Sequence, residues 1–319
     1  MTHRRPAAGA TGVARRGGLP IHGWLIIDKP AGLTSAAVIA IVRRLTGAAK
    51  AGHGGTLDPL ATGVLPVALG EATKTVAYVM DGCKTYVFTV RWGEKRDTDD
   101  CEGIATAVTD ARPDAEAIAA VLPRFTGLID QVPPDFSAVK VGGRRAYALA
   151  RSDEAVALQP RQGFIEDIAL VDQLDTDHAT FRVRSGKGVY MRSLARDIAQ
   201  ALGTLGHVSA LRRLSVGPFA EDQALGLDHA RELDAETILA QHLLPISTAL
   251  AGVPAVFVTE TEARRLQHGQ AIASLPVASR SHTNGLCRDA VVYATSAGRP
   301  VALAQIKGSE IRPLRVLNV

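Results

Sequence analysis

The sequence has little cysteine and no long apolar run, and both shortages narrow the possible classes of protein. Its three cysteines, Cys83, Cys101 and Cys287, lie far apart and lack the spacing of a zinc site. A disulfide framework is not indicated, and a reducing cytoplasm is the expected location. The longest apolar runs, such as residues 64–69, are far shorter than the ~20 residues that a membrane-spanning helix needs. We therefore expect no membrane insertion.

Nucleotide-binding and metal-binding motifs are also missing. The glycines that follow Lys50 lack the GxxxxGK[ST] order of a phosphate-binding loop, and no GxGxxG opens a helix. Histidines such as His53 and His207 have no HExxH or comparable pairing. The acidic segment 97–103 has Cys101 at a ligand position of a calcium loop and lacks the closing glutamate, so a polar turn is the better interpretation. We expect neither a metal nor a cofactor.

Positive charge is present in moderate excess and is clustered. Lysine and arginine number 36 against 32 acidic residues, which gives a net charge of +4 and a pI of about 9.1. Four arginines and no acid fall within the first eighteen residues, and residues 1–22 are expected to form a disordered basic tail rather than a targeting peptide. Further basic segments lie at 140–151 and 211–214. Nucleic acid is therefore a candidate partner.

Apolar spacing predicts two ordered domains after the tail. Residues 24–27 are typical of a short buried strand, and the helical pattern that follows can be capped by Thr34 or Ser35 and ended by Gly47. Residues 84–92 alternate as a half-buried strand, and a helix begins near Tyr190. From Pro245 onward, short apolar runs replace this pattern, with one helical stretch at residues 259–268. We predict a main domain over residues 23–245 and a small, mostly β domain over residues 246–319.

The stretch GHGGTLDPLATGVLPV, residues 52–67, places one carboxylate in a loop with almost no other polar side chain. That residue, Asp58, is followed by Pro59, and Asp-Pro is a common helix start in which aspartate caps and proline takes the first helical position. On these residues alone, a cap is favoured. The alternative is a carboxylate that acts as a nucleophile or base.

Six segments in a fixed order decide between these alternatives. They are DKPAGLTS (28–35), GHGGTLDPLATGVLPVALGEATK (52–74), KTYVFTVRWGEKRDTDD (84–100), PPDFSAVKVGGRRAYALAR (133–151), GKGVYMRSLARDIA (186–199) and GHVSALRRLSVGPF (206–219). In spacing, order and residue type, the chain from about Gly23 to Phe219 resembles the bacterial tRNA pseudouridine-55 synthases of the TruB type. A resemblance of this length is highly specific.

The resemblance implies a fold and a reaction. The fold would be α+β, with a mixed, largely antiparallel central sheet flanked by helices and a small β-rich PUA-like RNA-binding domain at the end. The reaction would convert uridine 55 in the T-loop of tRNA to pseudouridine, detaching the flipped-out uracil at N1 and rejoining it through C5. It is redox-neutral and needs no cofactor. The implied protein is a cytoplasmic monomer whose partner is the T-arm of tRNA.

The resemblance also implies roles for particular residues. Asp58 would be the nucleophile, Tyr86 would stack on the uracil and could act as a base at the sugar, and Arg192 would pair with Asp58. Tyr190 and Leu211 would line the pocket, and His53 would help to extrude the base or fill the gap that it leaves. The expected phosphate contacts are Lys29 and Lys74, and the expected backbone contacts are Lys140, Arg144, Arg145, Arg151, Arg212 and Arg213.

Two alternatives remain open at this stage. Asp58 could attack the base, attack the sugar or assist a glycal route. The chain could also be an RNA-binding folding chaperone, in which the loop around Asp58 is only structural and the basic surface is the working part.

Overall fold

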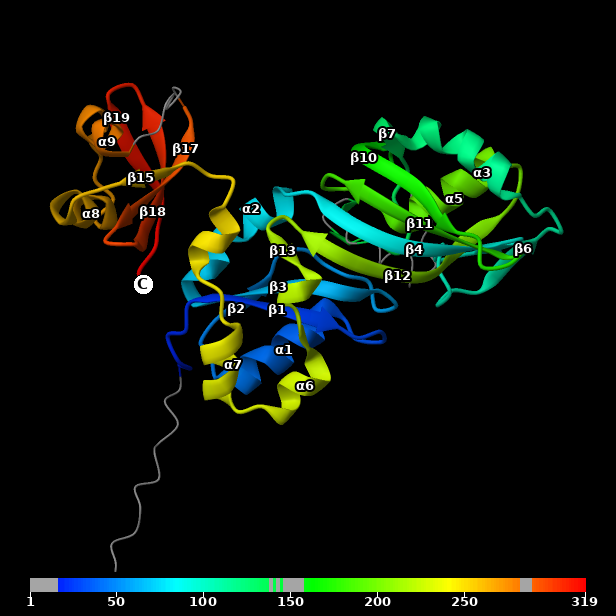
Figure 1. Cartoon of the computed structure of the whole chain (residues 1–319), viewed down its shortest axis with the longest axis horizontal. Coiled ribbons are helices and arrows are strands. Elements are labelled where there is room, and N and C mark those ends of the chain that lie inside the picture. The colour runs from blue at the N-terminus through cyan, green and yellow to red at the C-terminus, as the bar shows by residue number, and fades with distance from the viewer. Residues whose placement is uncertain (1–16, 138–139, 142–143, 146–157, 282–288) are drawn as a thin grey trace, which may run out of the picture.

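The computed structural model describes residues 17–137, 140–141, 144–145, 158–281 and 289–319. A ten-stranded sheet with flanking helices and a separate five-stranded sheet organise this part of the chain (Figure 1). The strands of the larger sheet are β1 (Gly23–Lys29), β2 (Ala51–His53), β3 (Thr62–Leu69), β4 (Lys84–Trp92), β7 (Gly127–Gln131), β10 (Arg161–Asp172), β11 (His178–Ser185), β12 (Gly206–Val216), β13 (Phe219–Ala220) and β14 (Leu225–Gly226).

The larger sheet is mixed and mostly antiparallel, as predicted. Its order is β14-β1-β3-β12-β4-β11-β10-β7, with β2 paired to β3 and β13 paired to β12. The pairs β1–β14 and β3–β12 are parallel, and the other pairs of this sheet are antiparallel. The parallel pair β3–β12 matters most for function, because it brings the end of the loop 54–61 beside residues 212–213.

Two groups of helices cover this sheet (Figure 1). The first consists of α1 (Ser35–Thr46), α6 (Leu227–Glu232) and α7 (Ala235–His242), and it lies against the β1 and β3 end. The second consists of α3 (Ala115–Val121) and α5 (Met191–Ala201), and it lies against β4, β10 and β12. The remaining elements of the larger unit are η1 (Gly70–Thr75), α2 (Val76–Asp81), β5 (Glu94–Arg96), β6 (Ala105–Val108), η2 (Leu122–Phe125), β8 (Lys140–Val141), β9 (Arg144–Arg145), η3 (Glu221–Gln223) and η4 (Ile246–Leu250).

Local sequence signals set the ends of α1 and α5. The Thr34 hydroxyl accepts a hydrogen bond from the Ala37 N–H, and Gly47 ends α1 in the left-handed region at φ 70°. The α5 helix follows Tyr190, as the apolar spacing predicted. Both helices therefore begin where their sequences allow the backbone to turn, and each presents its first turn to the loop that carries Asp58.

The C-terminal unit has its own sheet and core. Its strands are β15 (Ala255–Phe257), β16 (Ile272–Ala273), β17 (Val291–Ser296), β18 (Arg299–Lys307) and β19 (Glu310–Val316), in the order β15-β17-β18-β19-β16. Two helices flank them, α8 (Glu260–Gln267) and α9 (Ser274–Ser281). The helical stretch expected at 259–268 is confirmed as α8, and α9 was not expected. Its apolar residue Val277 packs into the core of this unit.

The packing moves both predicted domain boundaries. At the amino end, Leu19 forms a β-bridge with Ala48, and the His22 ring nitrogen Nδ1 accepts the Glu71 N–H at 3.1 Å. The ordered unit thus includes part of the segment 17–22 that was assigned to the tail, and residues 1–16 lie outside the described residues. At the other boundary, η4 packs into the cluster around Trp24. The larger unit therefore extends past residue 245 to the end of η4.

The end of β19 returns to the larger unit. Leu317 is fully buried in a cluster with Trp24 and Phe219, whose rings lie 5.2 Å apart. Lys74 Nζ donates to the Val316 carbonyl oxygen at 2.7 Å and to Glu71 Oε2 at 2.6 Å. These acceptors take two of the three donors of the ammonium, and the side chain is 29% exposed, so the phosphate contact of Lys74 stays a prediction. Lys74 also connects η1 to the C-terminal segment.

Leu317→Ala is expected to loosen this attachment and to destabilise the protein by about 2–5 kcal/mol, since it leaves a cavity in a closed cluster. A urea titration followed by tryptophan fluorescence measures the loss, because Trp24 lies in that cluster. Leu314→Ala is the matched control on β19, where the side chain is 43% exposed, and it should change stability by less than about 0.5 kcal/mol. Equal effects of the two substitutions would contradict the assignment of Leu317 to the core.

Candidate active site

The loop 54–61 holds Asp58 in an extended turn rather than at a helix start. After the bend at residues 59–60, the chain enters β3 directly, so the capping interpretation of Asp58 is wrong. The loop is tied to α1, because the Ser35 hydroxyl accepts the Leu57 N–H at 2.8 Å and donates to the Leu57 carbonyl at 3.0 Å. The Pro59 carbonyl accepts the Gly32 N–H at 2.8 Å. Backbone bonds on both sides therefore fix the carboxylate.

Arg192, the second residue of α5, forms the expected ion pair with Asp58. Its Nε donates to Asp58 Oδ2 at 3.0 Å. The arginine side chain is only 5% exposed, whereas that of Asp58 is 36% exposed. The guanidinium thus lies behind the carboxylate, and the carboxylate remains accessible from solvent.

The segment 97–103, interpreted from sequence as a polar turn, anchors the other side of Arg192. Arg192 Nη1 donates to the Thr98 carbonyl at 3.0 Å, and Arg192 Nε lies 3.6 Å from Asp100 Oδ2. One turn further along α5, Arg196 Nη1 binds Asp99 Oδ2 at 2.8 Å. Burial raises the pKa of Asp99, while Arg196 counteracts this shift. Sequence reasoning missed these partners, and the only signal was the acidity of the run.

Tyr86, Tyr190 and Leu211, the residues expected to contact the uracil, come from three different elements. Tyr86 lies on β4 and packs against the main core, and Leu211 on β12 is buried in that core. Tyr190 precedes α5, where its N–H donates to Gln131 Oε1 at 3.0 Å. Burial raises the pKa of the Tyr190 phenol, and the Asp58 carboxylate adds to the rise while Arg161 opposes it. Tyr190 is therefore a neutral phenol near pH 7.

His53 ends β2 at the entrance of the loop. Its Nδ1 accepts the Gly55 N–H at 3.3 Å, so the lone pair on Nδ1 is used inside the protein. Burial lowers the pKa of His53, and the Arg213 guanidinium lowers it further. The ring is thus neutral near pH 7, which suits stacking rather than binding to a phosphate.

This pKa shift predicts a loss of stability in mild acid. Because the pKa of His53 in the folded protein lies below its ordinary value of 6.5, the unfolded chain binds the proton first. The stability that the neutral ring provides is present above that value and is lost as the pH falls through the folded pKa. Urea midpoints at about pH 7.5 and about pH 5.5 should fall further for the wild type than for His53→Gln. An equal fall would show that His53 is not the titrating group.

Lys29 is buried and has a different role from the phosphate contact expected of it. Its Nζ donates to the carbonyls of Pro30 at 2.8 Å, Leu33 at 2.7 Å and Pro59 at 3.1 Å. Burial lowers the pKa of Lys29 to about 8, although Asp58 opposes the shift. The phosphate prediction for Lys29 is therefore wrong, because the ammonium is enclosed and fixes the turn beside Asp58.

Two of the residues expected to contact the RNA backbone, Arg212 and Arg213, also bind groups within the protein. Arg212 binds Asp28 through both Nη atoms, at 3.0 and 2.9 Å, and also binds Glu221. Arg213 is 1% exposed, so its predicted backbone contact is wrong. Of the other candidates, only the backbone of Lys140, Arg144 and Arg145 is described, and Arg151 lies outside the described residues.

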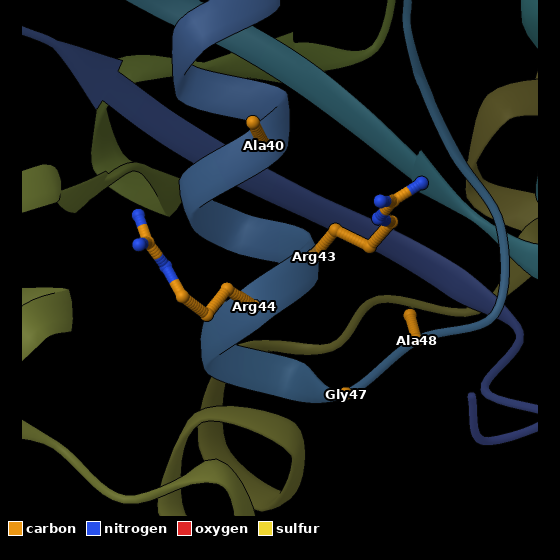
Figure 2. Close-up of a pocket in the computed structure, with 5 residues that line it drawn as sticks. All are labelled: Ala40, Arg43, Arg44, Gly47 and Ala48. Atoms are coloured by element: carbon orange, nitrogen blue, oxygen red, sulfur yellow. The ribbon is translucent and has the colours of Figure 1, made fainter. Parts of the chain in front are cut away.

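A separate pocket of about 440 Å³ lies at the end of α1, lined by Ala40, Arg43, Arg44, Gly47 and Ala48 (Figure 2). The two arginine side chains point to different sides of the helix in Figure 2, so they do not converge on one ligand. Among the described residues, no group of three or more histidine, cysteine, aspartate or glutamate side chains is arranged to hold a metal. No helix in the described ranges is long and apolar enough to cross a membrane.

Comparison with known proteins identifies the class of this fold and site. Residues 43–191 match the TruB family pseudouridylate synthase (N terminal domain), and residues 192–251 match the tRNA pseudouridylate synthase B C-terminal domain. A chain in the crystal structure of a Cbf5-Nop10-Gar1 complex is 26% identical with a TM-score of 0.70, over 93% of this chain and 85% of that chain. The protein is thus a pseudouridylate synthase.

Similarity to individual relatives specifies the family. The protein named tRNA pseudouridine synthase B from Rhodospirillum rubrum is 58% identical, over 96% of this chain and 99% of its own length. Its namesake from Bradyrhizobium diazoefficiens is 52% identical, over 96% of this chain and 88% of its own length. The chain therefore belongs to the TruB family.

Proposed function

We propose that this protein isomerises uridine 55 in the T-loop of tRNA to pseudouridine and that Asp58 is the nucleophile. The proposal is supported by the names of the relatives and by the geometry of one contact, the 3.0 Å pair between Arg192 and Asp58. A buried arginine that holds a partly exposed carboxylate fixes the orientation of that carboxylate and leaves it accessible to a substrate.

The reaction requires that one bond break and another form on the same two partners. The bond between N1 of uracil and C1′ of ribose breaks, the base turns while it remains in the site, and a bond between C5 and C1′ forms. C5 loses its proton and N1 gains one, so the product is an isomer. Asp58 attacks the sugar or the base, or assists loss of a sugar proton, and it is released unchanged at the end.

The neighbouring side chains have complementary roles in this scheme. Tyr86 stacks on the extruded uracil and acts as a base at the sugar, and Tyr190 and Leu211 enclose the base from the other sides. His53 fills the space that the base leaves in the RNA, since the ring is neutral and stands at the entrance. Arg192 keeps the carboxylate oriented throughout.

The partner is the T-arm of tRNA, and the enzyme acts as a cytoplasmic monomer without a cofactor. The PUA-like C-terminal domain contacts the RNA outside the T-loop. Its attachment supports this role, because the end of β19 and Leu317 hold it to the larger unit through Lys74 and the cluster around Trp24. Single-stranded and looped RNA is recognised mainly by shape, stacking and phosphate contacts.

Incubation with an unmodified tRNA transcript, followed by chemical mapping of pseudouridine, tests the proposed function. We expect one product at position 55 of the T-loop. Product at another position would change the substrate assignment. Absence of product, together with faster refolding of tRNA, would favour the chaperone alternative.

A further inference from the structure

Arg213 lies at the junction of three strands beside the active site. In the sheet register, it is directly opposite Tyr86 on β4 and directly opposite Gly63 on β3. A side chain at Gly63 would clash with the Arg213 backbone, since a Cβ there would come within 2.2 Å of the Arg213 carbonyl oxygen. The close approach of β3 and β12 therefore fixes Arg213 next to both the Asp58 loop and Tyr86.

The Arg213 guanidinium binds the chain on both sides of Asp58. Its Nε donates to the Val64 carbonyl at 2.8 Å, and its Nη2 donates to the Gly55 carbonyl at 3.0 Å. Its Nη1 donates to the Thr56 carbonyl at 3.3 Å. One planar group thus joins the start of the loop to the strand that follows it, and a shift of Arg213 would shift Asp58.

The hydrogen bonds of Arg213 to the loop do not require its positive charge. The three carbonyl acceptors are neutral, and no carboxylate within the described ranges lies at ion-pair distance from this side chain. Burial lowers the pKa of Arg213, while the adjacent Tyr86 phenol and the more remote Asp58 carboxylate raise it. A buried cation without a bound anion is costly. The side chain that does most to favour the charged guanidinium is Tyr86, which is hydrogen-bonded to it.

We propose that Arg213 is a positioning residue that holds the Asp58 loop and stabilises the phenolate form of Tyr86. This inference rests on the proposed function, in which Tyr86 is the base at the sugar. The phenol first releases its proton to solvent, and the phenolate oxygen beside the guanidinium then takes a proton from a ribose carbon. The neutral phenol returns that proton to the same ribose carbon when the C5–C1′ bond forms, so Tyr86 ends the cycle as the phenolate that began it.

Other ionisable groups lie around the Arg213–Tyr86 pair, and they must be separated from it. Asp58 lies on the loop, Lys84 on β4 and His53 on β2, and each is electrostatically linked to Arg213. Lys84 needs the most care, because burial lowers its pKa to about 8. Arg192 on α5 is paired with Asp58, and burial raises the pKa of Tyr190, which precedes this helix.

Two substitutions separate the charge of Arg213 from its hydrogen bonds. Arg213→Gln keeps donors but removes the charge, whereas Arg213→Lys keeps the charge but removes part of the carbonyl bracing. Single-turnover rates on tRNA transcript are measured against pH, with tRNA affinity and thermal unfolding measured in parallel. The tyrosinate absorbance of each variant, minus that of its Tyr86→Phe counterpart, reports ionisation of Tyr86 without requiring activity.

In the wild type, the single-turnover rate should rise with pH as the Tyr86 phenol ionises. We expect Arg213→Gln to move this rise, and the Tyr86 absorbance change, to higher pH by at least one unit. At neutral pH its rate should fall about tenfold or more, since each unit lowers the phenolate fraction tenfold, while tRNA affinity stays within about threefold. Arg213→Lys should keep the position of the rise and lower its plateau. If Arg213→Gln does not fold, a rise moved upward in Arg213→Lys overturns the proposal.

Other outcomes also overturn it. A rise that persists in Tyr86→Phe would assign the titration to Lys84, and an unshifted rise in Arg213→Gln would leave Arg213 as a brace only. Failure of the proposed function is distinguishable from both, because the wild-type protein would then make no pseudouridine in the same assay.

Discussion

Asp58→Asn is expected to abolish pseudouridine formation while the protein remains folded and still binds tRNA. The amide can accept the Arg192 Nε–H through its oxygen, but it cannot act as a nucleophile. Because the Asp58 side chain is 36% exposed and caps no helix, little stability is lost. Turnover should fall on the order of 10⁴-fold or more, as with deletion of other nucleophiles. Pseudouridine mapping and filter binding of the same tRNA measure the two effects.

A matched control for this variant is Asp130→Asn on β7, which removes one exposed carboxylate that is not paired with Arg192. It should retain full activity. Product formation by Asp58→Asn would reject the nucleophile assignment. Parallel loss of product and of tRNA binding would instead show that Asp58 is needed to build the RNA site. If wild type and variant refold tRNA equally and neither makes pseudouridine, the chaperone alternative holds.

Arg192→Ala should lower kcat far more than tRNA affinity and should also destabilise the protein. The substitution frees Asp58 from its orienting contact and leaves the buried Asp100 carboxylate without this partner. It also removes the donors to the carbonyls of Thr98 and Phe136. Breaking a buried ion pair costs about 3–5 kcal/mol. Single-turnover kinetics, tRNA affinity and urea denaturation measure the three consequences.

Arg196→Ala is the control that separates stability from chemistry. Arg196 lies one turn along the same helix and binds Asp99, Asp197 and the Val132 carbonyl, but it does not contact Asp58. It should lose stability while each folded molecule keeps nearly full turnover. If both arginine variants lose turnover alike per folded molecule, Arg192 is a scaffold residue. If Arg192→Ala loses affinity as much as kcat, it is an RNA contact.

Elements set by neighbouring residues could be predicted from the sequence. The ends of α1 follow from the Thr34 hydroxyl and the left-handed Gly47, both of which act within a few residues. The alternation of residues 84–92 predicted a half-buried strand, and the structure has β4 there, with Phe88, Val90 and Trp92 buried on one face. Residue types of this kind record their own local conformation.

The roles of the basic residues could not be predicted in the same way. Lys29 and Arg213 look like surface cations in the sequence, yet both are enclosed and bind carbonyls. Each has acceptors on the loop 54–61, which is distant in sequence from both: Lys29 donates to the Pro59 carbonyl, and Arg213 donates to the carbonyls of Gly55 and Thr56. Asp100 was missed for a related reason, because its partner Arg192 comes from a helix that the local pattern does not connect to the turn. Burial of a charge depends on where distant backbone groups meet it.

The cluster that joins Trp24 to Leu317 has a consequence for biosynthesis. Trp24 is in the first strand of the sheet, whereas Leu317 follows the last strand of the described chain. On the ribosome, the larger unit can pair its strands long before Leu317 emerges, so this apolar surface stays open for most of translation. The nascent chain therefore passes through a form in which the active-site strands are already paired but the apolar cluster around Trp24 is still exposed. A chaperone that binds exposed apolar surface would act at this stage.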